Sequence, residues 1–393
     1  MNKKRLAVIT GTRAEYGLLR PVLFKLLASD KLEPLLIVTG AHLSAEYGNT
    51  VKEIEADGLP IAARIQILKF GHGPLALPDT VAYTIQQFAR WFGENKPDGV
   101  LVLGDRYEIF AAAQAAAMMG VPIAHISGGD VTLGAADDYY RHCITKMASL
   151  HFPSCEEYAD RVIRMGEDPR RVFNVGGLGD ENIRTMPKMA LPELSESIGF
   201  DLSAPYGLVT FHPETAPGAP APTDQMTALL TAMEQVHAAT GLRYVITKSN
   251  ADAGGAAINA MIDAWAAQHS DFAAAYTSLG VKRYLSAMQH AAVVIGNSSS
   301  GVVETPTFGV PTVNIGDRQA GRIICQNVIC CPAEVERLTV TLKWATNEEF
   351  TEYARKTVSP YNGGQTSARI LQVLEQALYD PRLAAPKGFY DGE

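Results

Sequence analysis

The chain has 393 residues, of which 47% are hydrophobic and 19% charged, and this length exceeds what one ordinary hydrophobic core needs. The 42 acidic residues outnumber the 34 lysines and arginines, so the formal net charge is −8 and a long polyanion such as nucleic acid would be repelled. A small anion held by a few local arginines is still allowed.

The N-terminus does not resemble a targeting segment. Met1–Arg5 is basic, but the apolar run Leu6–Ile9 that follows is far too short for the hydrophobic region of a signal peptide. No other apolar stretch is long enough to cross a bilayer. We therefore expect a cytoplasmic protein without a membrane partner.

The cysteines argue against a secreted disulfide framework, because their number is odd. They form no C-x-x-C pair, and no histidine spacing typical of zinc accompanies them, so we expect no metal site. The adjacent residues Cys330 and Cys331 are expected to be buried in a strand. The five cysteines are Cys143, Cys155, Cys325, Cys330 and Cys331.

Apolar runs that end in glycine, aspartate or serine recur along the chain and lead into helical patterns. This βαβ rhythm predicts an α/β fold with parallel sheets. The expected strands of the first half are Leu6–Thr10, Pro34–Thr39, Gly99–Leu103 and Val121–Ile126, and those of the second half are Tyr206–Phe211, Arg243–Thr247, Ala291–Ile295 and Pro311–Ile315.

The segment Met186–Pro205 is richer in proline, serine and glutamate than its surroundings and is the best candidate for a domain boundary. We therefore expect an N-terminal α/β domain over residues 1–185 and a second over residues 186–370. A tail over residues 371–393 is expected to pack back on the N-terminal domain.

Polar segments follow the predicted strands. Ligands of parallel sheets bind beyond the carboxyl ends of the strands, so these segments are treated as one candidate site. Arginines, carboxylates and histidines occur together in them, which suits a cleft between two domains that binds a phosphorylated ligand. The segments are Gly11–Arg13, Gly40–His42, Gly104–Arg106, Ser127–Asp130, His212–Thr215, Lys248–Asn250 and the hydroxyl run from Ser298.

The stretch Gly296–Pro306 is the most informative, because an apolar run ends in three serines, Ser298 to Ser300, and then enters a predicted helix. Backbone N–H groups, hydroxyls and the positive end of a helix dipole would converge there on an anion. Glu304 follows one to two helical turns later and could accept hydrogen bonds from the vicinal hydroxyls of a ribose. The stretch predicts a site for a nucleoside diphosphate.

Five motifs stand out: Thr10–Gly17, Gly104–Glu108, Arg141–Lys146, Phe211–Thr215 and Gly316–Arg322. Together they resemble the hydrolysing UDP-N-acetylglucosamine 2-epimerases, the family that supplies N-acetylmannosamine or its diamino analogues for nonulosonic acid synthesis. The resemblance covers nearly the whole chain. It implies the glycosyltransferase-B architecture, two Rossmann-like domains that face each other across a deep cleft. It also implies a nucleotide-sugar substrate, no nicotinamide or other cofactor, and a homodimer or homotetramer.

The resemblance further implies contacts to the nucleotide, and their chemistry is suitable. Guanidinium groups clamp phosphates in bidentate fashion, and a glutamate can hold a ribose. For the arginines the alternative is a surface salt bridge, and for the histidine it is a hydrogen-bonded residue of the core. His42 matches a further family residue and is expected near the sugar. The implied nucleotide contacts are Arg13, Arg106, His212, Ser298, Ser299, Glu304 and Arg318.

The chemistry implied by the family needs two proton-transfer groups and a cradle for the leaving diphosphate. Asp105, at a strand end, is the first candidate, and His212 is a further catalytic candidate. Asp137 is expected to supply the second carboxylate, because at helical spacing Asp137 faces Arg141 and the next residue, Asp138, faces His142. The alternative is an ordinary helix N-terminus with acidic residues.

One departure from the family affects the mechanism. Many relatives carry glutamate before the Gly-Gly pair as a proposed catalytic acid or base, whereas this chain has Ser127 there. Because serine cannot take over proton transfer without a base beside it, we expect Asp130, or water held by Ser127, to supply that function. The segment that follows resembles the legionaminic-acid branch more than the sialic-acid branch, although Leu133 stands where that branch usually has glutamate.

Three functions stay open at this point. The leading one is a hydrolysing 2-epimerase, which releases a nucleoside diphosphate and a free manno-configured sugar. A non-hydrolysing 2-epimerase would keep the nucleotide attached, and a glycosyltransferase of the same fold would need an acceptor. The sequence does not distinguish UDP from GDP, or N-acetylglucosamine from a 2,4-diacetamido sugar.

Overall fold

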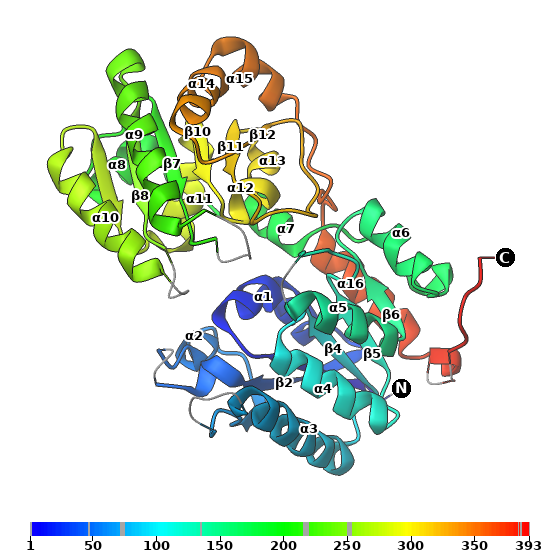
Figure 1. The fold of residues 1–393 in the computed structure, drawn as a ribbon. Helices are drawn as coiled ribbons and strands as arrows, with labels where there is room; N and C mark the ends of the chain where they lie inside the picture. The colour runs from blue at the N-terminus through cyan, green and yellow to red at the C-terminus, as the bar shows by residue number, and fades with distance from the viewer. Residues whose placement is uncertain are drawn as a thin grey trace. The chain divides into compact units, whose positions relative to one another are not determined.

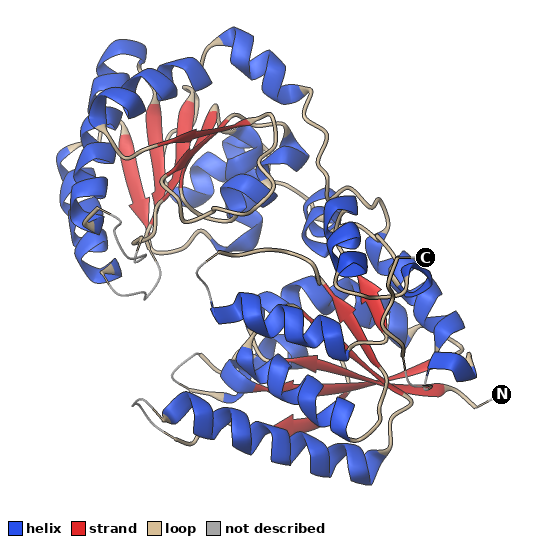
Figure 2. Cartoon of the chain, turned by 45° about the vertical axis from the view of Figure 1, so that its right-hand side comes forward, coloured by secondary structure: helices blue, strands red, loops and turns tan. Residues whose placement is uncertain are grey.

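Two parallel six-stranded sheets organise the chain in the computed structural model (Figures 1 and 2). The structure describes residues 2–45, 48–70, 75–133, 136–214, 220–249, 254–383, 385 and 387–392. Each sheet belongs to one of two compact units. Unit 1 comprises Met1–Val131, Ala135–Asn182 and Pro360–Glu393, and unit 2 comprises Thr132–Gly134 and Ile183–Ser359. The predicted α/β fold with two parallel sheets is confirmed.

Unit 1 has the strand order β3-β2-β1-β4-β5-β6, which is the order of dinucleotide-binding folds. Its chain reverses direction along the sheet between β1 and β4, which is where such folds place their ligands. The strands are β1 (Lys4–Thr10), β2 (Leu32–Thr39), β3 (Ile61–Ile65), β4 (Gly99–Leu103), β5 (Ile123–Ile126) and β6 (Leu150–Phe152).

Helices cover both faces of this sheet, as Figure 2 shows. Successive side chains of a strand point to opposite faces, so Leu6 and Val8 of β1 join the core beneath α1 and α16, while Ala7 and Ile9 join the core beneath α3 and α4. The helices are α1 (Arg13–Leu27), α2 (Val51–Ala56), α3 (Ala76–Asn95), α4 (Tyr107–Met118), α5 (Ala136–Met147), α6 (Glu156–Arg164), α7 (Leu178–Thr185) and α16 (Thr366–Ala377), with short 3₁₀ turns η1 (Gly40–Leu43), η2 (Pro169–Arg171) and η3 (Pro381–Leu383).

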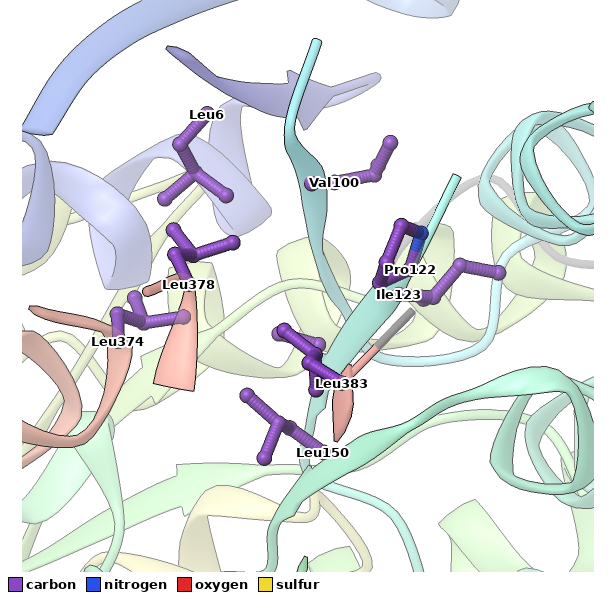
Figure 3. A pocket seen from close by; sticks show the side chains of 10 residues that line it. Leu6, Val100, Pro122, Ile123, Leu150, Leu374, Leu378 and Leu383 are labelled. Carbon is purple, nitrogen blue, oxygen red and sulfur yellow. The ribbon is translucent and has the colours of Figure 1, made fainter. Parts of the chain in front are cut away.

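The C-terminal segment completes unit 1. Leu374 and Leu378 lie beside Leu6 and Leu150 around a cavity of about 10 Å³, too small for a ligand (Figure 3). The hydroxyl of Ser29 donates to Glu375 Oε1 at 2.6 Å, which ties α16 to the end of α1. The return to unit 1 starts at Pro360, earlier than the predicted boundary at residue 371, because the apolar face of α16 is needed to cover the sheet.

Unit 2 repeats the same order as β12-β11-β10-β7-β8-β9. Val293 and Ile295 of β10 pack under α9 and α14, and Val294 packs on the opposite face under α8 and α11. The strands are β7 (Tyr206–Thr210), β8 (Arg243–Thr247), β9 (Ala273–Tyr276), β10 (Val293–Gly296), β11 (Thr312–Ile315) and β12 (Val328–Cys331), and the helices are α8 (Leu191–Ile198), α9 (Pro222–Thr240), α10 (Gly255–Gln268), α11 (Gly280–His290), α12 (Ser300–Val303), α13 (Thr305–Phe308), α14 (Val335–Ala345) and α15 (Glu348–Arg355).

The adjacent cysteines do lie in a strand, β12, but only Cys331 is buried and Cys330 is exposed. The expectation that both are buried is therefore wrong for Cys330. β12 is the edge strand of its sheet, so one of two neighbouring side chains can face solvent. Among the described residues no helix combines the length and the apolar character that crossing a membrane requires.

Candidate functional site

The carboxyl edge of the unit 1 sheet gathers the polar segments that the sequence singled out. Gly11–Arg13 follows β1, Gly104–Arg106 follows β4, and Ser127–Asp130 follows β5, which is paired with β4 in parallel register. All of these strands run in the same direction, so their ends meet at one edge. Thr215 and Asn250, which end predicted segments of the second half, lie outside the described residues.

Arg141 of α5 is the centre of the first group of side chains. Its guanidinium forms an ion pair with Asp105 after β4, and its Nη1 donates to Asp138 Oδ1 at 3.1 Å and to the backbone oxygen of Asp130 at 2.9 Å. The Arg141 side chain is only 6% exposed. A buried guanidinium thus joins the ends of β4 and β5 to the first turn of α5. We call Asp105, Asp137, Asp138, Arg141 and His142 the carboxylate cluster.

The two aspartates of α5 have different surroundings. Asp138 lies between Arg141 and His142, whose Nε2 is 3.6 Å from Asp138 Oδ2, so the predicted Asp138–His142 pair is confirmed. Desolvation of the Asp137 carboxyl, together with the charge of Asp105, raises the pKa of Asp137, although the charge of Arg141 opposes this shift. The structure therefore places beside Asp105 a second carboxyl group that holds a proton more readily than usual.

Asp130 lies at the edge of this cluster. Its backbone oxygen accepts from Arg141 through the bond just described. The charge of its carboxylate affects two buried groups of unit 1, Cys155 and Tyr361. Burial first, and then the Asp130 charge among other causes, raises the pKa of the Cys155 thiol to about 12 and also raises the pKa of Tyr361. Ser127, three residues earlier, has a left-handed backbone with φ of 63°.

Two predicted arginines of unit 1, Arg13 and Arg106, have contrasting environments. Arg13 is 63% exposed and forms an ion pair with Glu53 at 2.8 Å, which is the surface salt bridge named above as the alternative. Arg106 is partly exposed, and its Nε donates to the buried Glu108 Oε1 at 2.6 Å. Of these two arginines, only Arg106 is held at a strand end by a buried carboxylate, that of Glu108.

His42 is fully buried, and both of its ring nitrogens lie near threonine hydroxyls. Nε2 is 3.1 Å from Thr10 Oγ1 and Nδ1 is 2.8 Å from Thr50 Oγ1. Burial lowers the pKa of His42 to about 4, so the ring is neutral at physiological pH. These contacts are those of a structural histidine and do not support the expected position near the sugar.

Asn297 organises the carboxyl edge of unit 2. Its side-chain oxygen accepts from the His212 N–H at 2.7 Å, and its Nδ2 donates to the His212 oxygen at 2.8 Å. Its own backbone oxygen accepts from Arg318 Nη1 at 3.3 Å and from Gln319 Nε2 at 2.8 Å. The ends of β7, β10 and β11 are thereby joined through one fully buried amide.

His212 is only half-buried, with Nδ1 3.3 Å from Ser249 Oγ. It is therefore not a fully buried histidine of the core. Arg318, whose Nη1 donates to the Asn297 oxygen, lies just after the end of β11. The expected gathering of His212, Ser298 and Arg318 at one edge of this sheet is in agreement with the structure.

The serine turn, residues 298–300, differs from the expectation in one respect. The helix that follows is interrupted, because α12 covers only Ser300–Val303 and α13 only Thr305–Phe308. Pro306 lacks the N–H that would bond to the carbonyl of Val302, and its ring disfavours helical backbone at the residue before it. With so short a helix the dipole contributes little, and hydroxyls carry more of any anion contact. Ser298 and Ser300 hydroxyls lie 3.3 Å apart, and Ser299 is exposed.

Glu304 lies between the two short helices. Burial raises the pKa of Glu304 to about 7, against a smaller lowering by a hydrogen bond with Ser300. The nearby Tyr284 hydroxyl is 3.3 Å from Thr210 Oγ1, which itself is 2.6 Å from Thr247 Oγ1. A carboxyl group with a pKa near neutrality, close to several hydroxyl groups, is suited to accept hydrogen bonds from a diol.

Sequence analysis missed four buried groups in these edges. Asn297 is fully buried, and Glu214 is 8% exposed with Oε1 accepting from the Asp317 N–H at 3.0 Å. Glu15 and Glu108 are 6% and 0% exposed. Each of the four belongs to a quoted segment, but a single polar letter in a loop or helix start gives no signal that it will be buried.

Burial and the negative charge of Glu108 raise the pKa of Glu15 to about 8. Its Oε2 accepts from the N–H groups of Gly11 and Thr12 at 2.7 and 3.1 Å, which closes the capping box of α1. The signal that could have identified Glu15 is therefore the Thr12–Glu15 spacing, which predicts a cap but not the burial.

The fold consists of two Rossmann-like units, with a cluster of carboxyl groups at the sheet edge of one and serine hydroxyls and a guanidinium at the sheet edge of the other. A sequence model of the UDP-N-acetylglucosamine 2-epimerase family matches residues 25–375. The chain belongs to this family.

Two relatives show how near the similarity is. A protein of Campylobacter jejuni named GDP/UDP-N,N'-diacetylbacillosamine 2-epimerase (hydrolyzing) is 36% identical over 350 residues, which are 89% of this chain and 89% of that protein. The polysialic acid biosynthesis protein P7 of Escherichia coli is 36% identical over 361 residues, which are 91% of this chain and 90% of that protein.

A solved structure shares the fold. The crystal structure of UDP-GlcNAc 2-epimerase from Neisseria meningitidis bound to UDP-GlcNAc superposes with a TM-score of 0.77 at 16% identity, over 95% of this chain and 100% of that chain. At this identity the likeness concerns the fold, and it supports the glycosyltransferase-B type that the sequence motifs implied.

Proposed function

We propose that the chain is a hydrolysing sugar-nucleotide 2-epimerase. Its substrate would be a UDP- or GDP-linked 2-acetamido sugar, either N-acetylglucosamine or its 2,4-diacetamido-6-deoxy analogue. The products are the free manno-configured sugar and the nucleoside diphosphate. The observation that carries the proposal is the carboxylate cluster, because a buried arginine there forms ion pairs with Asp105 and Asp138, and Asp137, whose pKa is raised, lies near them at the same sheet edge.

The reaction needs this kind of cluster. No carbonyl activates the C2 proton of such a sugar, so its removal must be coupled to cleavage of the C1–O bond, with the diphosphate leaving as the C1=C2 double bond of a glycal forms. Hydration then adds a proton to C2 from the opposite face and hydroxide from water to C1. Two proton-transfer groups of different basicity are therefore required.

We assign the base to Asp105 and the proton donor to Asp137. Asp105 lies at the end of β4 in an ion pair with Arg141, where its carboxylate can take up a proton, whereas the raised pKa of Asp137 favours a group that arrives with a proton. Asp130 is the further candidate for the role left vacant by Ser127. Turnover that survives Asp130→Asn in full while Asp105→Asn abolishes it would remove Asp130 from the mechanism.

The nucleotide contacts follow the chemistry of the strand ends. In unit 2 we assign the diphosphate to Ser298, Ser299 and Arg318, with His212 stabilising the charge that develops on the leaving oxygen. Glu304 is assigned to the ribose hydroxyls. In unit 1, Arg106 is assigned to the diphosphate, and the exposed Arg13 to a weaker contact.

The test is incubation with UDP-N-acetylglucosamine, and with the diacetamido analogue on UDP and on GDP, followed by proton NMR in deuterated water. The expected result is a free reducing sugar that carries deuterium at C2, with equimolar nucleoside diphosphate. A manno-configured sugar that stays attached to its nucleotide would indicate the non-hydrolysing reaction instead. No turnover of any of the three substrates would contradict the proposal.

A further inference from the structure

Two buried carboxyl groups of unit 1, Glu15 and Glu108, have no part in the mechanism above, yet both contact Gly11 at the end of β1. Glu15 Oε2 accepts from the Gly11 N–H at 2.7 Å. On the Glu108 side, a Cβ added to Gly11 would lie 2.6 Å from Glu108 Oε1. The two carboxyl groups are therefore neighbours across one glycine that leaves no room for a side chain between them.

Their hydrogen bonds leave one oxygen of each group unused. Glu15 Oε2 is held by two backbone N–H groups, and Glu108 Oε1 is held by Arg106 Nε at 2.6 Å. Among the described residues, Glu15 Oε1 and Glu108 Oε2 are buried and have no hydrogen-bond partner. An ionised carboxylate oxygen buried in this way is costly, and a proton on one of the two groups removes most of that cost.

The charges near Glu15 and Glu108 also favour one proton on the pair. Glu15 and Glu108 together would carry two negative charges against the single positive charge of Arg106, and Asp137 of α5 adds a further carboxyl on the Glu108 side. His42 of η1, which bonds through its N–H to the Gly11 oxygen, is neutral because its pKa is lowered to about 4. Tyr107, the first residue of α4, is a further titratable neighbour of Arg106, which precedes that helix. One proton on the pair brings the pair and Arg106 to neutrality.

We infer that Glu15 and Glu108 share one proton and act as positioning residues, releasing Arg106 from Glu108 to the substrate's diphosphate while the proton keeps the vacated pair singly charged. This inference rests on the proposed function, because it takes the diphosphate as the ligand of Arg106. When the shared proton is lost to solvent at higher pH, the doubly charged pair holds Arg106 more strongly and repels the incoming phosphates. Binding of the nucleotide then requires uptake of one proton from solvent by the pair.

The consequence is a pH dependence of binding rather than of the chemical step. Burial raises the pKa of Glu15 to about 8, which sets where the proton is lost. The dissociation constant for the nucleotide should therefore be nearly constant below this pH and rise about tenfold between pH 7 and pH 9, as expected when one proton is linked to binding. A merely structural role of the two carboxyl groups would not produce this profile.

The experiment measures binding of UDP and of GDP by calorimetry from pH 6.5 to 9 with the full chain, using whichever nucleotide binds more tightly at pH 7. In Glu15→Gln the amide oxygen can still accept from the Gly11 and Thr12 N–H groups, so the cap of α1 is kept. Ionisation of the nucleotide affects both proteins equally and is divided out. After this correction, we expect the dissociation constant of Glu15→Gln to change less than about twofold between pH 7 and pH 9. The control Glu55→Gln removes a carboxylate from an exposed ion pair with Arg64 and should keep the wild-type profile.

A second measurement uses the wild type alone, in case Glu15→Gln folds poorly. At pH 8.5 in buffers of different ionisation enthalpy, nucleotide binding should take up about three-quarters of a proton, as a pKa of about 8 requires. Binding without proton uptake, or a rise that persists in Glu15→Gln, overturns this inference and leaves the proposed function intact. Absence of binding by either nucleotide at pH 7 overturns both.

Discussion

Glu304→Gln should remove a pH dependence of nucleotide binding that lies on the acid side of neutrality. Burial raises the pKa of Glu304 to about 7. If its ionised carboxylate accepts hydrogen bonds from ribose hydroxyls, affinity must rise with pH as the group loses its proton. The raised pKa thus has a functional consequence of defined sign: binding is weak below the folded-state pKa and strong above it.

The magnitude follows from the titration. At pH 5.5, one and a half units below a pKa of about 7, only about 3% of Glu304 is ionised, so wild-type affinity should be about thirtyfold lower than at pH 8.5. Glutamine resembles the protonated form at every pH. The ratio of the dissociation constants, variant over wild type, should therefore rise about thirtyfold between pH 5.5 and pH 8.5.

Calorimetric titration with UDP or GDP measures this ratio directly. Effects common to both proteins, including ionisation of the nucleotide and of the Glu15–Glu108 pair, cancel in it. The matched control is Glu336→Gln on the exposed side of α14, for which the ratio should stay at one. A ratio for Glu304→Gln that is high but independent of pH would refute the reasoning, because it would mean that Glu304 is already ionised throughout the range.

Three further outcomes are expected. Arg141→Met should lower the free energy of unfolding of unit 1 by about 3 kcal/mol, the low end for a broken buried ion pair. Arg64→Met breaks an exposed ion pair and should lower it by at most about 1 kcal/mol. Equal losses, measured by calorimetry, would contradict this prediction. Gly296→Ala should strongly destabilise unit 2, since a Cβ there would overlap a carbonyl oxygen of β7 at φ of 133°, while Gly301→Ala, with 3.4 Å to its nearest neighbour, should be tolerated, as melting temperatures will show. The pKa of buried Glu167 is lowered to about 2 by hydrogen bonds from His151 and two lysines, against burial, so it stabilises the fold above pH 4.5 and loses that effect as pH falls toward 2. Glu167→Gln should therefore lower the melting temperature more at pH 6 than at pH 3.

Much of the fold could be predicted from apolar runs with turn residues after them. The bounds Gly99–Leu103 and Arg243–Thr247 agree with β4 and β8, because these central strands are buried on both faces and read as continuous hydrophobic runs. β6 and β9 were not predicted. Leu150–Phe152 is only three residues long, and Ala273–Tyr276 consists mostly of alanine, so both are strands because β5 and β8 supply their hydrogen-bond partners.

The site was predicted in part, and the reason for the difference is physical. Strand-end logic identified Asp105, His212 and Arg318, since in a parallel sheet the chemistry must lie at that edge. It could not identify Glu15 or Glu108, because an acidic residue in the first turn of a helix is ordinarily a solvated partner of the helix dipole. Only the tertiary packing, in which α1 and α4 begin at the same edge, buries them against one glycine.

The turn that carries Ser127 has a strained backbone and leaves little room for side chains. Its φ of 63° is sparsely populated by residues with a side chain, at a cost of about 1–2 kcal/mol, and such strain persists where the surroundings over-determine it. Those surroundings are visible in the next two residues: a Cβ on Gly128 would lie 2.9 Å from Thr145 Oγ1, and one on Gly129 would overlap the backbone of α6. Of the first three residues of the turn, only Ser127 can therefore present a side chain.

Two substitutions separate the hydroxyl from the backbone at this position. Ser127→Gly should raise stability by about 1 kcal/mol because it relieves the left-handed strain, and it deletes the hydroxyl. Ser127→Ala deletes the same hydroxyl and keeps the strain. If the hydroxyl assists proton transfer, both variants lose turnover to the same extent while their melting temperatures differ. Loss confined to Ser127→Gly would instead mean that the fixed backbone, by holding Asp130 and Arg141 in place, is what the reaction needs at this turn.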